Sequence, residues 1–241
     1  MASATPLPIC TTTCNTFGHV PRRMGPGRDT EGLDAARHRL VDHLVERGHV
    51  ERDSTERALR AVPRHEFVPQ GSRQNAYADR PLPIGSDQTI SAPHMVAIMT
   101  DLLAADRGDR VLEIGTGCGY HAAVTAEVVG PGNVYSVEYH ADLARESRER
   151  LARLGYDVHV RQSDGYEGWP DHAPYDRAYL TCAPPTVPET VVRQVRTDGR
   201  VVAPEGAGAG SQTLVVLTPT ERGVERETHG RVRFVPMRGG A

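Results

Sequence analysis

Residues 111–120, with the sequence VLEIGTGCGY, decide the fold. The apolar run from Arg110 to Ile114 predicts a short β-strand, and a stretch with helical spacing begins at Tyr120. Glycines occupy positions 115, 117 and 119 between them. Glycine allows positive φ angles and leaves no Cβ atom in the way, so a flat ligand can lie against the backbone at the start of the helix. This stretch predicts a nucleotide-type binding site.

The spacing of the glycines distinguishes between nucleotide ligands. A dinucleotide-binding fingerprint, G-x-G-x-x-G, would need a third glycine at position 120, where this chain has Tyr120. The observed order is G-x-G-x-G behind the acidic residue Glu113, which resembles motif I of the class I S-adenosylmethionine (SAM) methyltransferases. Glycine-rich turns occur in many proteins, so the rest of the chain has to decide the function.

Helix-like and strand-like segments alternate after this stretch. The predicted helices are 120–129, 141–154 and 189–196, and the predicted strands are 133–137, 157–162, 177–182 and 200–204. Such alternation is typical of an α/β fold with a doubly wound, mostly parallel, Rossmann-like sheet and helices on both faces. Strands at 213–218 and 231–235 would form an antiparallel pair at the end of this sheet. Ligands of this fold class bind at the carboxyl ends of the strands.

Acidic residues follow two of the predicted strands. Glu138 lies nineteen positions after Gly119, at the tip of the second strand, where a carboxylate can accept hydrogen bonds from both hydroxyls of a ribose. Asp164 and Gly165 follow the third strand, where the aspartate can accept a hydrogen bond from an adenine amino group. The pattern alone leaves open that Glu138 is an ordinary surface glutamate and Asp164 an ordinary turn residue.

The chain divides into three predicted parts. Residues 1–30 have no helical or strand period, and we expect a disordered extension with Met24 as an alternative start. Residues 31–105 are predicted to be a small helical region on the substrate side, and residues 106–241 the SAM-binding domain.

The region 31–105 begins with two predicted helices. The first starts at Leu33 and ends before Gly48. The second has Asp53 and Glu56 as an approximate capping box and ends before Pro63. We interpret both helices as a packing module without a direct part in catalysis.

A third helix in this region places hydroxyl groups beside its start. Pro93 suits its first turn, and Ser91 or Ala92 is the expected N-cap. Thr89 and Ser91 therefore lie beside unpaired backbone N–H groups, a place that attracts a carboxylate. The alternative is that Ser91 merely caps the helix.

Composition excludes several classes of protein. The chain has 241 residues and a formal charge of −3, and all 28 basic residues are arginine. A nucleic-acid-binding protein would show a net positive charge and clustered basic runs, and this chain shows neither. No apolar run approaches the roughly 18 residues of a membrane span, and the N-terminus lacks a secretory pattern. We therefore expect a cytoplasmic protein without nucleic-acid or membrane partners.

The four cysteines do not indicate a disulfide scaffold in a chain of this length. Cys10 and Cys14 with His19 match no familiar zinc spacing, so we expect no metal. Cys118 and Cys182 should share the rim of the ligand site, most simply as small buried side chains. The alternative hypothesis is that their oxidation blocks the site.

Taken together, the motifs resemble the protein-L-isoaspartate (D-aspartate) O-methyltransferase family, whose members methylate abnormal aspartyl carboxyls in ageing proteins. The matching pieces are RHEFVP, AYADRPLPIG, QTISAPHM, VLEIGTGCGY with HAAV, VYSVE, SDGYEGWPDHAPYD, PETVVRQVRTDGRVVAPEG, SQTL and RFVPM. They cover nearly everything from Leu33 onwards, and QTISAPHM is the most specific of them. The chain departs from the pattern at Ser86-Asp87, at Cys118 and in the loop APPTVP.

The resemblance also implies roles for particular residues. Ser91 falls on the active-site serine of the family and Thr89 on the threonine lining the same pocket. The residues implied to contact SAM are Glu113, Gly115, Thr116, Gly117, Gly119, Glu138, Tyr139, Asp164 and Gly165. The implied partners are proteins and peptides with L-isoaspartyl, and possibly D-aspartyl, residues, and the implied oligomeric state is a monomer.

The chemistry needs no general base. A substrate carboxyl has a pKa near 4 and is already ionised at neutral pH, so the enzyme has to supply alignment with the methyl donor. Two other functions remain open at this point. One is a relative that methylates a normal aspartate in a dedicated peptide to form an aspartimide, and the other is a SAM-binding sensor without catalysis.

Overall fold

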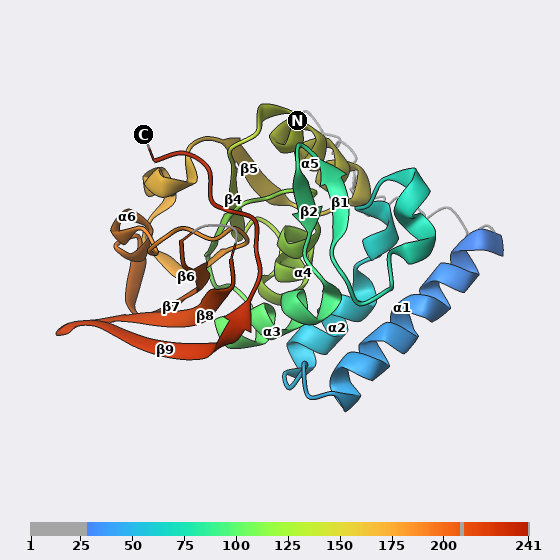
Figure 1. Cartoon of the computed structure of the whole chain (residues 1–241), viewed down its shortest axis with the longest axis horizontal. Helices are drawn as coiled ribbons and strands as arrows, with labels where there is room; N and C mark the ends of the chain where they lie inside the picture. Colours follow the sequence, from blue (N-terminus) through green and yellow to red (C-terminus); the bar gives the residue numbers. More distant parts are fainter. Residues whose placement is uncertain (1–27, 208–209, 241) are drawn as a thin grey trace, which may run out of the picture.

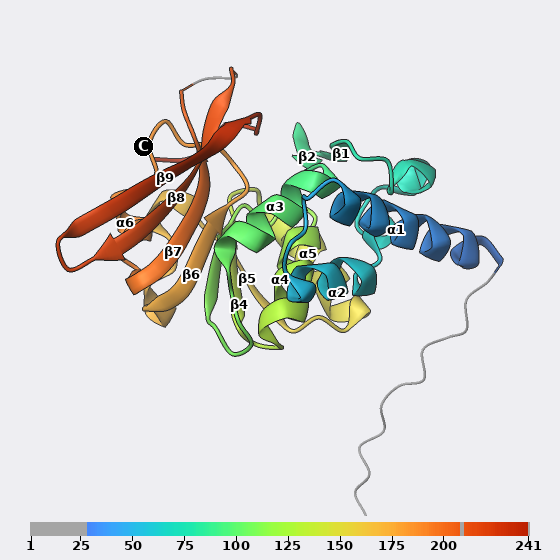
Figure 2. The same cartoon turned by 90° about the horizontal axis from the view of Figure 1, so that it is seen from below.

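A seven-stranded sheet runs through the molecule, with helices packed on both faces (Figures 1 and 2). The computed structural model describes residues 28–207 and 210–240. Its α-helices are α1 (Arg28–Glu46), α2 (Asp53–Ala61), α3 (Pro93–Leu103), α4 (Tyr120–Val129), α5 (Ala141–Leu154) and α6 (Glu189–Val192). Its 3₁₀ helices are η1 (Arg64–Glu66), η2 (Gln70–Asn75), η3 (Gly165–Glu167) and η4 (Pro170–His172). Its strands are β1 (Leu82–Gly85), β2 (Gln88–Ile90), β3 (Val111–Ile114), β4 (Val134–Glu138), β5 (Val158–Gln162), β6 (Tyr175–Leu180), β7 (Val195–Glu205), β8 (Gln212–Thr220) and β9 (Gly223–Val232).

The sheet has the order β5-β4-β3-β6-β7-β8-β9. Strands β3 to β7 pair in parallel, whereas β8 and β9 are antiparallel. This confirms the predicted α/β fold with a mostly parallel sheet and a terminal antiparallel pair. Strand order reverses between β4 and β6 around β3, which is where such sheets bind ligands.

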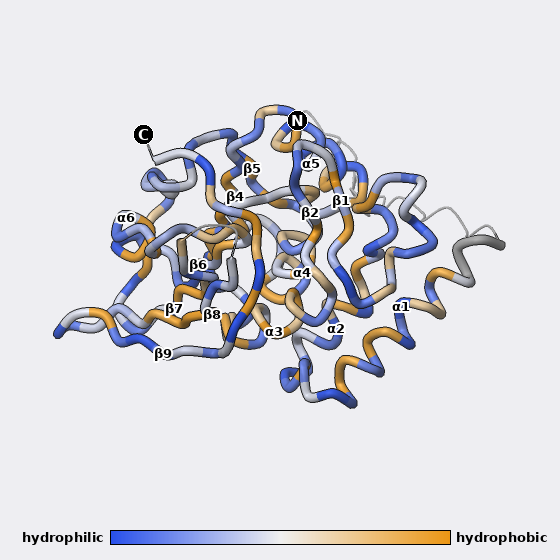
Figure 3. Tube along the Cα trace, viewed as in Figure 1, coloured by the Kyte–Doolittle hydropathy of each residue, from blue (hydrophilic) through white to orange (hydrophobic). Residues whose placement is uncertain are grey.

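Three of the elements predicted after α5 are wrong in their bounds, and one of them is the strand predicted at 200–204, which runs over Val195–Glu205. The final strand was expected at 231–235, but β9 runs over Gly223–Val232. It is an edge strand whose side chains are almost all exposed, so its sequence shows no alternation of buried and exposed residues. Figure 3 shows that β9 is mostly hydrophilic. The predicted helix 189–196 stops at Val192, since Val195 already pairs with Tyr175 of the sheet. The other predicted strands of the sheet before β7 agree within two residues.

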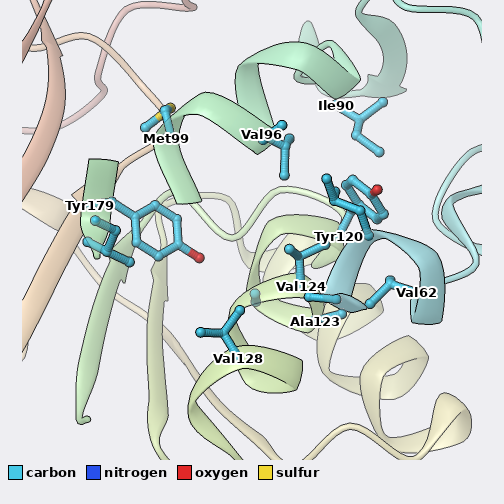
Figure 4. Packing of buried hydrophobic residues seen from close by; sticks show 14 of the residues in the cluster. Val62, Ile90, Val96, Met99, Tyr120, Ala123, Val124, Val128 and Tyr179 are labelled. Atoms are coloured by element: carbon cyan, nitrogen blue, oxygen red, sulfur yellow. The ribbon is translucent and has the colours of Figure 1, made fainter. Parts of the chain in front are cut away.

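The central helix α4 is buried on nearly all sides. It lies between the sheet and α2, which explains why its sequence is apolar all round. Figure 4 shows Val62, from the end of α2, beside Ala123 and Val124 of α4, with Tyr179 of β6 pointing toward the same helix. The resulting hydrophobic cluster joins residues from α1, α2 and α3 to β3, α4 and β6, so both predicted parts of the chain share one core.

The beginning of the described chain corrects two predictions. The first helix starts at Arg28, so the last three residues of the predicted extension are helical, whereas residues 1–27, with Cys10, Cys14, His19 and Met24, lie outside the described residues. The second helix lacks the predicted capping box, and its N-cap is Arg52. The backbone N–H groups of Glu51 and Arg52 instead donate to Oδ2 of Asp101, at 2.5 and 3.2 Å, so a residue of α3 holds the start of α2.

The proline-rich segment before α3 forms a small separate hairpin. Strands β1 and β2 pair in antiparallel fashion, and Ser86 and Asp87 at the turn have φ angles of 50° and 56°. Consecutive left-handed residues are typical of the tight turns that suit the twist of a hairpin. The hairpin brings Gln88 and Thr89 to the ligand side of the sheet.

Two properties of the described ranges bear on the predicted partners. None of their helices is long and apolar enough to cross a bilayer. No group of three or more His, Cys, Asp or Glu side chains in these ranges is arranged to hold a metal ion.

Candidate active site

A cavity of about 750 Å³, including the solvent at its mouth, lies at the carboxyl ends of β3, β4 and β6. Its walls come from six parts of the chain that are far apart in sequence. They are β2 with Ser91 and the start of α3, the glycine-rich loop with the start of α4, the tip of β4, Gly165 after β5, the tip of β6, and the segment 235–238. The cavity therefore lies where the sheet topology predicts a ligand.

The glycine-rich loop forms one wall in a conformation that requires glycine. Gly115 and Gly117 have φ angles of 98° and 54° and line the cavity, and Gly119, with φ of 88°, is the N-cap of α4. A Cβ atom on Gly115 would collide with Oγ1 of Thr181, which hydrogen-bonds to the Gly115 carbonyl. The N–H of Gly115 donates to the carbonyl of Val137 at 2.8 Å, so the loop is fixed to the neighbouring strand.

Glu138 lines the cavity with its carboxylate already oriented by the backbone. The N–H of Gly117 donates to Oε2 at 2.8 Å, and the N–H of His140 donates to Oε1 at 2.9 Å. The residue is only 5% exposed, which excludes the alternative of an ordinary surface glutamate. A carboxylate oxygen can accept more than one hydrogen bond, so both oxygens of Glu138 can also accept a hydrogen bond from a ligand. Tyr139, beside it, lines the same wall and is 47% exposed.

Glu113 does not line the cavity, although the resemblance placed it among the SAM-contacting residues. Strand register puts it directly between Ser136 of β4 and Tyr179 of β6. The Tyr179 hydroxyl donates to Oε1 at 2.8 Å, and the Ser136 hydroxyl contacts Oε2. Ser136 in turn lies 2.6 Å from the hydroxyl of Thr116, which does line the cavity. Glu113 therefore contacts the cavity only indirectly, through Ser136 and Thr116.

Burial determines the charge of Glu113. Desolvation raises the pKa of its carboxyl to about 8, although hydrogen bonds from Ser136 and Tyr179 counteract this and the nearby charge of Glu138 adds to it. The carboxyl is therefore protonated at neutral pH. A neutral acid in this position is consistent with its complete burial and with the absence of any cation among its described contacts.

Asp164 and Gly165 lie at the end of the cavity next to β5. Oδ1 of Asp164 accepts from the N–H of Tyr166 at 2.9 Å, and Oδ2 accepts from the N–H of Gly240 at 2.7 Å. Asp164 is the N-cap of η3, and its side chain is not part of the cavity wall, so its proposed hydrogen bond to adenine stays a prediction. Gly165 does line the wall, and a Cβ atom there would lie 2.5 Å from Cγ2 of Ile114.

Thr89 and Ser91 line the same cavity. Within residues 28–207 and 210–240, neither hydroxyl makes a hydrogen bond to another group. The N-cap of α3 is Ala92, without a side-chain cap, so the alternative that Ser91 caps the helix is wrong. Two cavity-lining residues therefore carry hydroxyls without a hydrogen-bond partner in the described part of the chain.

Several lining residues were missed by sequence reasoning. They are Gln88, Ile90, Val96, His121, His140, Thr181 and the segment 235–238. The segment 235–238 reaches the cavity because backbone hydrogen bonds join Ala183 to Val235 and Met237. Only the matching piece RFVPM gave a signal for it, and nothing in the sequence reveals this long-range pairing.

Cys118 and Cys182 both line the cavity, as expected for residues on one rim of the ligand site. Desolvation raises the pKa of the Cys118 thiol, and it raises that of Cys182 to about 12. Both thiols are therefore protonated at neutral pH, the form that reacts slowly with oxidants. Blocking of the site by oxidation stays a prediction.

Comparison with known proteins agrees with this geometry. Residues 35–241 match the family model described as protein-L-isoaspartate(D-aspartate) O-methyltransferase. The chain is 50% identical over 209 residues to protein-L-isoaspartate O-methyltransferase 2 of Archaeoglobus fulgidus, covering 86% of this chain and 94% of the relative. It is 45% identical over 206 residues to the enzyme of Methanothermobacter thermautotrophicus, covering 84% and 95%.

Solved structures agree as well. A protein-L-isoaspartate O-methyltransferase structure matches with a TM-score of 0.77 and 31% identity over 84% of this chain and 66% of that one. A Plasmodium falciparum structure, described as the same kind of enzyme in complex with S-adenosyl-L-homocysteine, matches with a TM-score of 0.72 and 22% identity over 84% and 98%. The chain therefore belongs to the protein-L-isoaspartate (D-aspartate) O-methyltransferase family.

Proposed function

We propose that this chain is a protein-repair methyltransferase that transfers the methyl group of SAM to the free carboxyl of L-isoaspartyl residues in damaged proteins and peptides. The observation that carries this proposal is one cavity with two unlike sides. A glycine-rich loop and the oriented carboxylate of Glu138 form one side, and the unpaired hydroxyls of Thr89 and Ser91 form the other.

The residues on the first side fit SAM. Glu138 presents oriented acceptor oxygens for the ribose, and Gly165 leaves space where any side chain would strike Ile114. Gly115, Thr116, Gly117 and Gly119 would hold the cofactor along the loop, with Tyr139 and Asp164 beside the adenosine end. When bound, SAM supplies a methyl group attached to a positively charged sulfur, which a carboxylate can accept without a base.

The residues on the second side would orient the substrate. The hydroxyls of Thr89 and Ser91 can donate hydrogen bonds to a carboxylate, and the N-terminus of α3 adds a favourable partial positive charge. Correct alignment of two reacting groups can contribute roughly 7–11 kcal/mol to lowering a barrier. An isoaspartyl carboxyl is ionised at neutral pH, so the chain needs only to position it and to exclude water.

We infer further that the enzyme works as a cytoplasmic monomer, without nucleic-acid or membrane partners, and accepts D-aspartyl residues as secondary substrates. The net charge of −3 and the absence of a membrane-spanning helix in the described ranges support the absence of those partners.

The experiment compares three peptides that differ only in one residue: L-isoaspartyl, D-aspartyl or normal L-aspartyl. The full chain is incubated with each peptide and methyl-labelled SAM, and base-labile methyl esters are counted. We expect esters on the isoaspartyl peptide and none on the normal one. Equal labelling of the normal peptide would favour an aspartimide-forming enzyme, and SAM binding without any labelling would favour a sensor.

A further inference from the structure

We propose that His121 is a further SAM-binding residue, whose Nδ1 atom accepts a hydrogen bond from the α-ammonium group of the cofactor. The inference rests on the proposed function only in taking SAM as the ligand. His121 is the second residue of α4, lines the cavity and is 7% exposed. None of the predicted cofactor contacts includes it.

The surrounding hydrogen bonds determine which nitrogen of His121 carries its proton. The Thr100 hydroxyl donates its only hydrogen to the carbonyl of Val96 at 2.7 Å. Its oxygen lies 3.1 Å from Nε2 of His121, so it must accept a hydrogen bond from that nitrogen. The ring hydrogen is therefore on Nε2, and Nδ1 carries a lone pair.

That lone pair faces the cavity. In the described part of the chain Nδ1 has no hydrogen-bond partner, and it is not among the polar atoms sealed in the interior without one. The ring packs against that of Tyr179 in a tilted arrangement, with centroids 4.3 Å apart and planes at 36°, which restricts its orientation. Desolvation lowers the pKa of His121 to about 3, so the ring is a neutral acceptor at neutral pH.

The other lining residues indicate that this acceptor would bind the amino-acid end of SAM. The adenosine end is predicted beside Glu138 and Gly165, so the amino-acid end extends toward Ser91, Val96 and His121. Among the described lining residues, the formally charged side chains are Glu138 and Arg238. The Glu138 carboxylate is held toward the ribose position, so no carboxylate is left for the ammonium group. His121 is a buried lining residue that offers an uncharged acceptor in its place.

The test measures binding of two ligands that differ in the amino-acid end. S-Adenosylhomocysteine carries the α-ammonium group, whereas 5′-methylthioadenosine has the same adenosine and sulfur without it. Calorimetry on the full chain gives both dissociation constants. His121→Phe keeps an aromatic ring beside Tyr179 but removes the acceptor nitrogen. For this variant we expect about tenfold weaker binding of S-adenosylhomocysteine, or about 1.4 kcal/mol. Binding of 5′-methylthioadenosine should stay within twofold.

His121→Asn is the matched variant, because its amide oxygen can take the place of Nδ1. We expect it to keep most of the affinity for S-adenosylhomocysteine. Equal weakening of both ligands by His121→Phe would mean a purely structural role and would overturn the proposal, as would no change in either. If His121→Phe does not fold, nitrogen NMR of the histidine rings in the native protein tests the proposal instead. The Nδ1 signal should move with S-adenosylhomocysteine but not with 5′-methylthioadenosine, and identical responses would overturn the proposal.

These measurements need no isoaspartyl substrate. Failure of the peptide assay with intact, His121-dependent binding would reject the repair function alone. Normal peptide methylation with no effect of His121→Phe on binding would reject this inference alone.

Discussion

The two sides of the cavity are built in different ways. On the proposed cofactor side, the carboxylate of Glu138 lines the cavity and accepts hydrogen bonds from two backbone N–H groups. Asp164, next to the lining residue Gly165, likewise accepts two. On the substrate side, the hydroxyls of Thr89 and Ser91 have no hydrogen-bond partner among the described residues. The hairpin that carries Thr89 is a separate two-stranded sheet, not part of the main one.

This difference matches the ligands we propose for the two sides. SAM always has the same shape, so a rigid, preorganised wall can be matched to it. Damaged proteins share only the abnormal aspartyl residue and differ around it. A small hairpin with free hydroxyls can hold that one carboxylate and leave the neighbouring residues unconstrained.

The largest expected effect is on the cofactor side. Glu138→Ala removes the acceptors for two ribose hydroxyls, and hydrogen bonds to a charged group contribute about 1.5 kcal/mol or more each. We expect S-adenosylhomocysteine to bind about 100-fold more weakly by calorimetry. Glu225→Ala, on the exposed edge strand β9, is the control and should bind normally. A change below threefold in Glu138→Ala would show that the oriented carboxylate does not hold the cofactor.

The next prediction concerns Glu113, which is buried behind the proposed cofactor side, and its effect on the stability of the fold. The folded protein keeps the Glu113 proton up to a pKa of about 8, whereas an ordinary carboxyl loses it near 4.5. Stability from this group is therefore present below pH 4.5 and is lost as the pH rises to 8. Glu113→Gln, which is neutral at every pH, should abolish this loss, which amounts to roughly 3 kcal/mol between pH 5 and pH 8 because one pKa unit corresponds to about 1.4 kcal/mol.

Urea unfolding at pH 5 and pH 8 measures this difference. The same loss of stability in Glu113→Gln and in the wild type would contradict the assignment of a protonated Glu113. Glu113→Ala serves as the contrasting variant. It leaves the hydroxyls of Ser136 and Tyr179 without their acceptor and should be destabilised at both pH values.

The smallest effect is expected on the substrate side. Ser91→Ala removes one orienting hydroxyl, and we expect kcat to fall about tenfold, or about 1.4 kcal/mol. Binding of S-adenosylhomocysteine should not change, because we propose that Ser91 contacts the substrate and not the cofactor. Ser72→Ala, in η2 outside the cavity, is the control. Wild-type turnover in Ser91→Ala would remove this serine from the mechanism.

Local patterns in the sequence predicted much of the cofactor side. The apolar strand before Gly115, the stop at Gly130 and the acid at Glu138 are each visible within a few residues, because helix period, turn chemistry and strand ends are local properties. The β9 strand could not be predicted in the same way. Its exposed side chains do not alternate, and only pairing with β8 makes it a strand.

The sequence by itself determined the alternating β/α order, the glycine-rich loop and the presence of hydroxyls at the start of α3. Only the tertiary structure decided that Glu113 turns away from the cavity between Ser136 and Tyr179, and that His121 turns into it. The physical reason is that backbone preferences act over a few residues. The register between strands, and hence the neighbours of a buried side chain, depends on packing between segments more than twenty residues apart.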